Sequence, residues 1–133
     1  SDTICIDGAG DSALERMIAT WDPQVMDVLM LLHPRDRAIG YPGAGDFMRD
    51  EAGRIRRRGA DATAPYVFTG IQFINPALFA NCPSGAFSMN VLYDRLLGAD
   101  GYFNRIASVV HAGAWLHVGD PQGLADAEAF LQA

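Results

Sequence analysis

Val28-Leu29-Met30-Leu31-Leu32 is the stretch that decides the fold class. Five consecutive apolar residues without alternation predict a strand buried on both faces, as parallel strands in α/β proteins are. His33-Pro34 is predicted to end this strand. Because segments with strand and helix patterns alternate on both sides of it, we predict an α/β protein.

Towards the N-terminus, a strand is expected at residues 3–6 and a helix at residues 13–21. Asp11 or Ser12 is placed to cap the helix. Towards the C-terminus, residues 46–49 and 54–57 are predicted to form a hairpin, whose turn uses Gly53 for a positive φ. Residues 66–74 give the strongest strand signal, interrupted by Gly70, where the missing Cβ lets another backbone or a ligand approach closely.

Five further elements are predicted after residue 75. A short helix is expected at residues 76–79 and a longer one, capped by Ser88, at residues 88–97. Residues 106–110 and 114–118 are expected to pair as a hairpin around Ala112-Gly113. A final helix is expected at residues 121–131. Its spacing predicts that Leu124, Ala127 and Leu131 are buried, while Asp126 and Glu128 point outward.

Composition narrows the class of protein. The 133 residues, half of them apolar, are the size of one modest domain. The net charge of −6, with every positive charge on arginine, argues against nucleic-acid and anionic-membrane binding. Neither a membrane-spanning run nor a signal-peptide pattern is visible, so we expect a cytoplasmic protein, and Cys5 and Cys82 are expected to be reduced thiols.

Phosphate-binding motifs of the common kinds do not occur. There is no GxGxxG and no GxxxxGK, and the chain has no lysine for a phosphate grip. The arginines at positions 54 and 56–58 form either a solvated hairpin arm or a phosphate-binding patch. The residues alone therefore indicate an α/β piece with a candidate acidic pocket, and Asp2 is expected at a strand end.

A series of short motifs resembles the bacterial sugar-1-phosphate nucleotidyltransferases. The motifs are, in order, Ser1-Asp2, Gly45-Asp46-Phe47 with Gly53-Arg54, Phe68-Thr69-Gly70-Ile71 with Pro76, and Trp115-Leu116-His117-Val118-Gly119 with Pro121. Within this family the chain looks most like the N-acetylmuramate 1-phosphate uridylyltransferase group, whose members are often labelled mannose-1-phosphate guanylyltransferases. The resemblance implies a Rossmann-like nucleotide-diphospho-sugar transferase fold, with a mixed sheet and flanking helices. Residues 1–133 would be its C-terminal, sugar-phosphate-binding domain, and the nucleotide-binding half with the catalytic lysine would lie upstream.

The resemblance also implies an activity. Such an enzyme joins a nucleoside monophosphate from an NTP, here UTP by preference, to a sugar 1-phosphate, here N-acetylmuramate 1-phosphate, and releases pyrophosphate. Its setting would be bacterial cell-wall recycling, and its cofactor Mg²⁺, which aligns the two anionic substrates. Two alternatives stay open: a mannose-1-phosphate guanylyltransferase, and a truncated, non-catalytic module that binds a sugar phosphate or a partner. The base, the sugar and the oligomeric state are not fixed by the sequence.

Site residues follow from the same resemblance. Asp2 occupies the position of the family's first metal aspartate, and His117 the second, where many relatives have aspartate. Imidazole is a poor Mg²⁺ ligand, so His117 either contacts a phosphate oxygen, binds the ion through water, or is an ordinary strand-end residue. Gly45, Thr69 and Gly70 are expected to offer main-chain groups to the sugar, and structural turns are the alternative explanation of the two glycines.

Two departures from the family pattern concern other side chains. Many relatives carry a Glu-Lys-Pro motif that grips the sugar and the phosphate. Here Arg57-Arg58-Gly59-Ala60-Asp61 stands in that region, and an arginine could replace the lysine as a bidentate phosphate partner. His33 and His111 match no family position and are expected to be structural.

Overall fold

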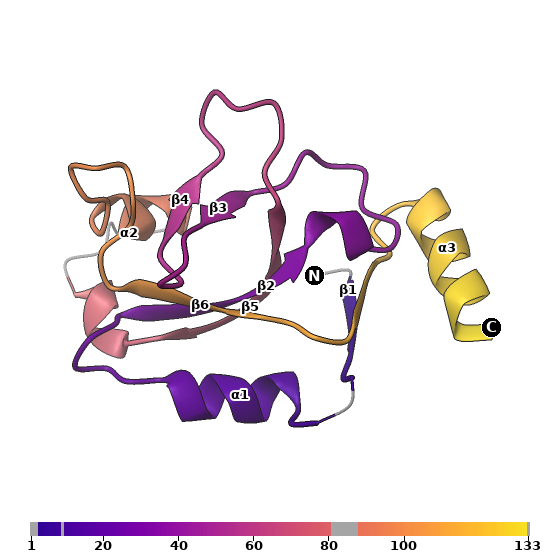
Figure 1. Cartoon of the computed structure of the whole chain (residues 1–133), viewed down its shortest axis with the longest axis horizontal. Coiled ribbons are helices and arrows are strands. Elements are labelled where there is room, and N and C mark those ends of the chain that lie inside the picture. The colour runs from indigo at the N-terminus through magenta and orange to yellow at the C-terminus, as the bar shows by residue number, and fades with distance from the viewer. Residues whose placement is uncertain (1–2, 9, 81–87, 133) are drawn as a thin grey trace.

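A five-stranded mixed sheet forms the centre of the computed structural model, which describes residues 3–8, 10–80 and 88–132 (Figure 1). The strand order is β4-β3-β5-β2-β6. The strands are β2 (Val28–Pro34), β3 (Phe47–Arg49), β4 (Ile55–Arg57), β5 (Tyr66–Ile74) and β6 (Ile106–Val110). β2 runs parallel to β6 and antiparallel to β5. The predicted α/β class is therefore confirmed.

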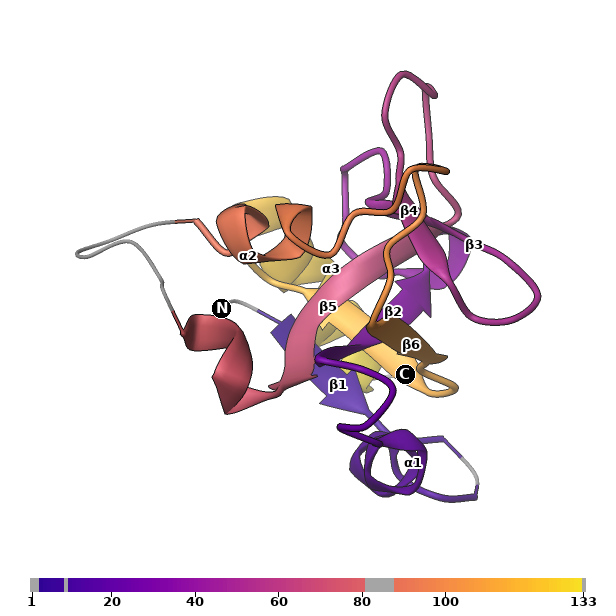
Figure 2. The ribbon, with the colours of Figure 1, turned by 90° about the vertical axis from the view of Figure 1, so that its left-hand side faces the viewer.

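The remaining elements surround this sheet. They are β1 (Thr3–Ile6), β7 (Ala114–His117), α1 (Ala13–Thr20), α2 (Asn90–Asp94), α3 (Pro121–Gln132) and two short 3₁₀ helices, Arg35–Arg37 and Pro76–Phe79. β1 and β7 pair with each other in a separate two-stranded sheet. Figure 2 shows α1 on one side of the central sheet and α2 on the other. None of the helices in the described ranges has the length and apolarity that crossing a membrane requires.

β2 is the centre of the core, as its apolar run predicts. Residues 28–32 are all fully buried. Side chains alternate along a strand. Val28, Met30 and Leu32 therefore pack on one face, with Ile55 and Tyr93. Leu29 and Leu31 pack on the other face with Met17 of α1. β2 therefore contributes side chains to the hydrophobic clusters on both faces of the sheet.

Two of the predicted local motifs are confirmed in detail. Ser12 caps α1 through a capping box: its hydroxyl accepts a hydrogen bond from the Glu15 N–H at 3.1 Å. β3 and β4 form the predicted hairpin, with Gly53 at a φ of +85°. The α2 helix is shorter than predicted, although Met89 and Leu96 at its two ends do pack against the core.

The hairpin predicted for residues 106–110 and 114–118 does not form. β6 pairs with β2 in the central sheet, whereas β7 pairs with β1 in the other. The chain crosses between the sheets at Gly113, where an added Cβ would lie only 1.8 Å from the carbonyl oxygen of Ile6. Both strands pair with strands that are distant in the sequence. Gly113 is therefore needed where the chain passes close to the backbone of Ile6, and not for a hairpin turn.

The burial predicted for α3 is wrong for two of its three residues. Ala127 is 2% exposed, but Leu124 and Leu131 are 51% and 56% exposed. The helix packs on β7 through its smallest residues, because a Cβ at Gly123 would lie 2.3 Å from the carbonyl oxygen of His117. The buried stripe is therefore Gly123 and Ala127, and the leucines lie off it. Glu128 is exposed, as predicted, while Asp126 is half-buried.

Candidate functional site

Three of the predicted site residues line one cavity of about 280 Å³ at the junction of the two sheets. Thr69 and Gly70 come from β5 and His117 from the end of β7. The cavity, which we call the histidine cavity, is lined by Thr3, Tyr41, Asp46, Val67, Phe68, Thr69, Gly70, Trp115 and His117. Segments that the sequence places far apart thus converge on one hollow.

The fourth predicted residue, Gly45, lines an adjoining cavity of about 390 Å³. This arginine cavity is lined by Gly45, Asp46, Phe47, Arg57, Arg58, Gly59, Phe68, Asn90 and Tyr93. The two cavities share Asp46 and Phe68. The Asp46 carboxylate accepts a hydrogen bond from the Phe68 N–H at 2.8 Å, which fixes the wall between them.

A bulge in β5 shapes the histidine cavity. Thr69, Gly70 and Ile71 all lie opposite Leu31, and Gly70 has a φ of +89°. The buried Thr69 hydroxyl donates to the Leu31 carbonyl at 2.8 Å. The same hydroxyl accepts from the Ile71 N–H at 3.3 Å, so it is used by the fold, and the polar groups that Thr69 and Gly70 keep for a ligand are those of their main chain. This is the type of contact that the family resemblance implies.

Gly45 has a clear packing role. Its φ is +92°, and an added Cβ would lie 2.1 Å from the Ala64 carbonyl oxygen. Its N–H donates to the Tyr41 hydroxyl at 3.1 Å. The glycine is therefore required by the backbone path, and its contact with a sugar stays a prediction.

The main chain of His117 is held by hydrogen bonds, while one nitrogen of its ring has no partner in the part of the chain that the structure describes. His117 lies opposite Thr3 in the β1–β7 pair, and its N–H donates to the Ile39 carbonyl at 2.8 Å. Its Nδ1 and the Trp115 Nε1 are buried and have no hydrogen-bond partner among the described residues. An unsatisfied buried polar group costs about 1–3 kcal/mol. Trp115 and His117 both line the histidine cavity, so a polar group that reached these nitrogens from the cavity would recover that cost.

The predicted metal site is only partly within the described residues. Asp2 lies outside them, directly before Thr3. Among the residues with described positions, no three His, Cys, Asp or Glu side chains cluster as metal ligands. Mg²⁺ commonly uses one or two carboxylates together with substrate phosphates and water. Asp46 supplies a carboxylate to the cavity lining, and one of its oxygens accepts a hydrogen bond from the Phe68 N–H. The lining would fit Mg²⁺ if Asp2 and a phosphate added oxygens, whereas His117 suits a phosphate oxygen or a softer ion.

Tyr41 and Trp115 are cavity residues that motif reasoning did not assign. The Tyr41 ring lies 6.0 Å from Trp115 and 6.2 Å, edge-on, from His117, measured between ring centroids. Tyr41 is in a glycine-rich loop, and its isolated aromatic side chain is the only sign in the sequence that it could belong to a binding site. Trp115 stands two residues before His117, so strand alternation places both side chains on one face.

His33 and His111 are structural, as predicted. Both are buried. The His33 ring nitrogens contact the carbonyl oxygens of Pro34 at 2.9 Å and Gly113 at 3.1 Å, and His111 Nε2 contacts those of Ile6 and Ala114 at 3.0 Å. These rings connect the two sheets. Burial lowers the pKa of His33 below its usual value, and the nearby His111 and Arg37 act in the same direction.

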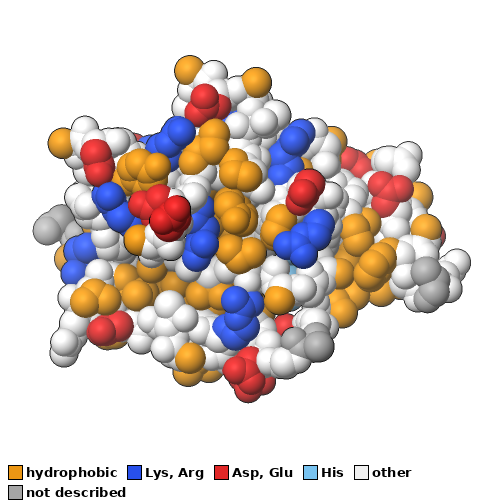
Figure 3. Space-filling view, viewed as in Figure 1, with side chains coloured by type: hydrophobic (Ala, Val, Ile, Leu, Met, Phe, Trp, Pro, Cys, Tyr) orange, Lys and Arg blue, Asp and Glu red, His pale blue; other side chains and the backbone are white. Residues whose placement is uncertain are grey.

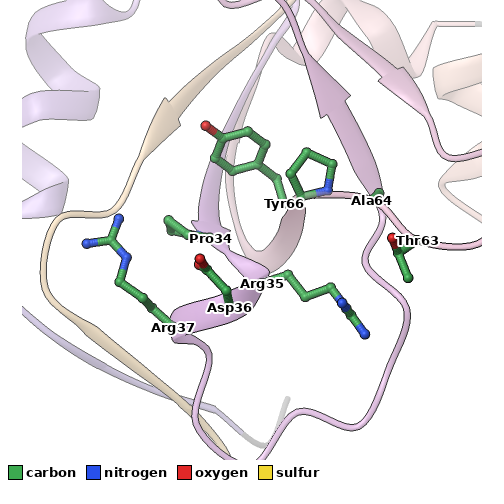
Figure 4. Close-up of a pocket in the computed structure, with 8 residues that line it drawn as sticks. Pro34, Arg35, Asp36, Arg37, Thr63, Ala64 and Tyr66 are labelled. Carbon is green, nitrogen blue, oxygen red and sulfur yellow. The ribbon is translucent and has the colours of Figure 1, made fainter.

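A larger cavity of about 630 Å³ contains none of the predicted residues. It lies between the loop after β2 and the loop before β5 (Figure 4). The Arg35 and Arg37 side chains extend in opposite directions there, with Asp36 between them. Arg35 Nε donates to the Gly43 carbonyl at 3.0 Å. The two guanidinium groups of this cavity point away from each other, so the cavity is a weaker candidate for binding a phosphate than the other two cavities.

Comparison with known proteins agrees with the resemblance seen in the motifs. No family model matches the chain. Over 130 residues, which are 98% of its length, the chain is 38% identical to N-acetylmuramate alpha-1-phosphate uridylyltransferase of Caulobacter vibrioides. The match covers 52% of that protein, so the chain spans about half the length of this curated relative. Over nearly its whole length the chain is therefore similar to a sugar-1-phosphate uridylyltransferase, and the resemblance expected from the motifs is confirmed.

Proposed function

We propose that the chain forms the sugar-phosphate-binding part of a nucleotidyltransferase. The reaction would join UMP from UTP to a sugar 1-phosphate, with N-acetylmuramate 1-phosphate as the preferred acceptor, and release pyrophosphate. The main support is the convergence of Thr69, Gly70 and His117 on one cavity. Similarity to a uridylyltransferase over 98% of the chain supports the reaction class. The mixed sheet is compatible with a Rossmann-like nucleotide-diphospho-sugar transferase fold, which we propose for the whole enzyme.

The chemistry sets what the cavity must do. A phosphate oxygen of the sugar attacks the α-phosphorus of UTP, and both reactants are anions. Their repulsion must be reduced and their reacting atoms aligned. Mg²⁺, when bound, supplies positive charge to both phosphates. We propose Asp2 as its carboxylate ligand, because Asp2 stands at the position of the family's first metal aspartate.

His117 and Trp115 have separate roles in this proposal. The unpartnered His117 Nδ1 can bind a phosphate oxygen directly or meet the ion through water. The Trp115 indole N–H donates to an oxygen of the acceptor. Gly70, exposed at the bulge, lets sugar hydroxyls approach the main chain. These groups bind and orient, and none of them is assigned to proton transfer.

Catalysis by this chain alone is not expected. The sequence has no lysine, and the family's catalytic lysine is expected outside these 133 residues. We therefore propose that the chain binds the acceptor and that turnover needs the nucleotide-binding half. A mannose-1-phosphate guanylyltransferase is the alternative with the same geometry, and a non-catalytic sugar-phosphate-binding module is the other.

Two measurements separate these possibilities. Calorimetric titration of the chain with N-acetylmuramate 1-phosphate, mannose 1-phosphate and UTP should show the tightest binding for the first. Protein made from the full reading frame that encodes the chain should release pyrophosphate from UTP when that sugar is present, and the Asp2→Asn variant should not. Release from GTP with mannose 1-phosphate would favour the guanylyltransferase. Binding without turnover would favour the module, and absence of both would refute the proposal.

A further inference from the structure

Arg58 differs from Arg54, Arg56 and Arg57 in having no carboxylate partner among the described residues. Arg54 pairs with Asp100 at 3.0 Å, Arg56 with Asp61 at 3.3 Å, and Arg57 with Asp94 at 2.6 Å. Figure 3 shows basic and acidic side chains interleaved over this part of the surface. These three pairs are partly exposed and match the solvated-arm interpretation.

The contacts of Arg58 are all with neutral groups. Its Nη1 donates to the carbonyl oxygens of Asp61 at 3.2 Å and Ala62 at 3.4 Å. Its Nε is buried and has no hydrogen-bond partner in the described ranges, and no acidic group described there lies within ion-pair distance. Arg58 as a whole is half-buried, so its charge is partly solvated, and an anion in the adjacent cavity would supply the counter-ion that the described residues do not.

The surroundings of Arg58 place this cation at the proposed acceptor site. It lines the arginine cavity with Gly45, and that cavity shares Asp46 and Phe68 with the histidine cavity. The Arg58 N–H donates to the Asp46 carbonyl at 3.1 Å, which holds the base of the side chain against the shared wall. Arg57 lines the same cavity, but its charge is already balanced by Asp94.

We propose that Arg58 binds an oxyanion of the acceptor in the arginine cavity. A guanidinium presents paired N–H groups that match a carboxylate or a phosphate. This inference rests on the proposed function, since N-acetylmuramate 1-phosphate carries both kinds of anion. Arg58 would then distinguish anionic sugars from neutral ones.

The test compares ligands that differ by one anionic group. The chain is titrated by calorimetry with N-acetylmuramate 1-phosphate, N-acetylglucosamine 1-phosphate and free N-acetylmuramate. Arg58→Gln keeps hydrogen-bonding capacity but removes the charge. Arg56→Gln is the control, because Arg56 is in the same arm, pairs with Asp61 and lines neither cavity. Melting curves of both variants check that they are folded.

The expected result is a loss of affinity for N-acetylmuramate 1-phosphate of about tenfold or more in Arg58→Gln, with no change in Arg56→Gln. If only the two muramate ligands are weakened, the bound group is the carboxylate. If only the two phosphorylated ligands are weakened, it is the phosphate. Unchanged affinity for all three ligands in Arg58→Gln overturns the inference.

A second measurement needs neither a sugar ligand nor a variant. Inorganic phosphate is titrated into the wild-type chain while the ¹⁵N resonance of the Arg58 Nε is followed by NMR. A saturable shift supports the anion site, even if no sugar 1-phosphate binds and the proposed function fails. An unmoved Arg58 resonance, in a chain that binds the sugar phosphates, would leave the function standing and reject Arg58.

Discussion

Thr3 and His117 lie directly opposite each other in the antiparallel β1–β7 pair, although they stand near opposite ends of the sequence. Both line the cavity that contains Thr69 and Gly70 of β5. The position of His117 relative to the central sheet therefore depends on the short β1 strand as well as on β7.

His117 is the first residue to test, because its side chain departs from the aspartate of many relatives. His117→Ala should raise the metal concentration needed for half-maximal rate by about tenfold, since ligands and their immediate partners commonly contribute that much to metal affinity. His117→Asp should restore a more usual Mg²⁺ site. The measurement is initial rate with UTP and a sugar 1-phosphate against metal concentration, in protein from the full reading frame.

Melting curves of the same variants provide the control. If His117 only packs at the strand end, both substitutions should change the melting temperature and leave the metal dependence as it is. That outcome would remove His117 from the site.

Gly45→Ala should destabilise the protein by about 2–4 kcal/mol. The residue has a φ of +92°, and the added Cβ would lie 2.1 Å from the Ala64 carbonyl oxygen. Gly101→Ala is the matched control, because Gly101 has a φ of +83° and nothing within 4 Å of an added Cβ. Urea unfolding should give a cost of about 1 kcal/mol for the control. Equal costs at the two positions would show that the Ala64 contact relaxes freely.

Local patterns explain which parts of the fold the sequence predicted well. The β2 run, the Ser12 cap and the Gly53 turn depend on neighbouring residues, so each appears in the sequence itself. The pairing of β6 and β7 depends on strands far away in the chain. Hydrogen-bond partners of that kind leave no local signal, which is why a hairpin was expected there.

The site shows the same division. His117, Thr69 and Gly70 are predicted site residues because they lie in family motifs, and the structure brings them to one cavity. Tyr41 and the unpaired state of Arg58 were not visible, because each depends on which other side chains fold against it. A run of four basic residues near positions 54–58 does not reveal which of them has found a carboxylate.

The exposed leucines of α3 give a third prediction. Leu124→Gln and Leu131→Gln should each change the free energy of unfolding by less than about 0.5 kcal/mol, because surface substitutions usually do. Ala127→Gln is the contrasting variant, since Ala127 is 2% exposed against β7. Urea unfolding should show a cost of about 1–3 kcal/mol for that variant. A large loss in either leucine variant would indicate that the helix packs differently.

The last prediction concerns pH and His33. Burial is the main reason that the pKa of His33 is below its ordinary value, with the nearby His111 and Arg37 adding smaller effects in the same direction. The unfolded chain, with an imidazole pKa of about 6.5, therefore binds a proton more readily than the folded chain does. By linkage, the stability that His33 contributes is fully present above that value and is lost as the pH falls below it. The melting temperature of the wild-type chain should decrease between pH 7.5 and pH 5, and that of His33→Gln should start lower and decrease less. Parallel curves for the two proteins over this range would show that His33 does not carry the pH dependence.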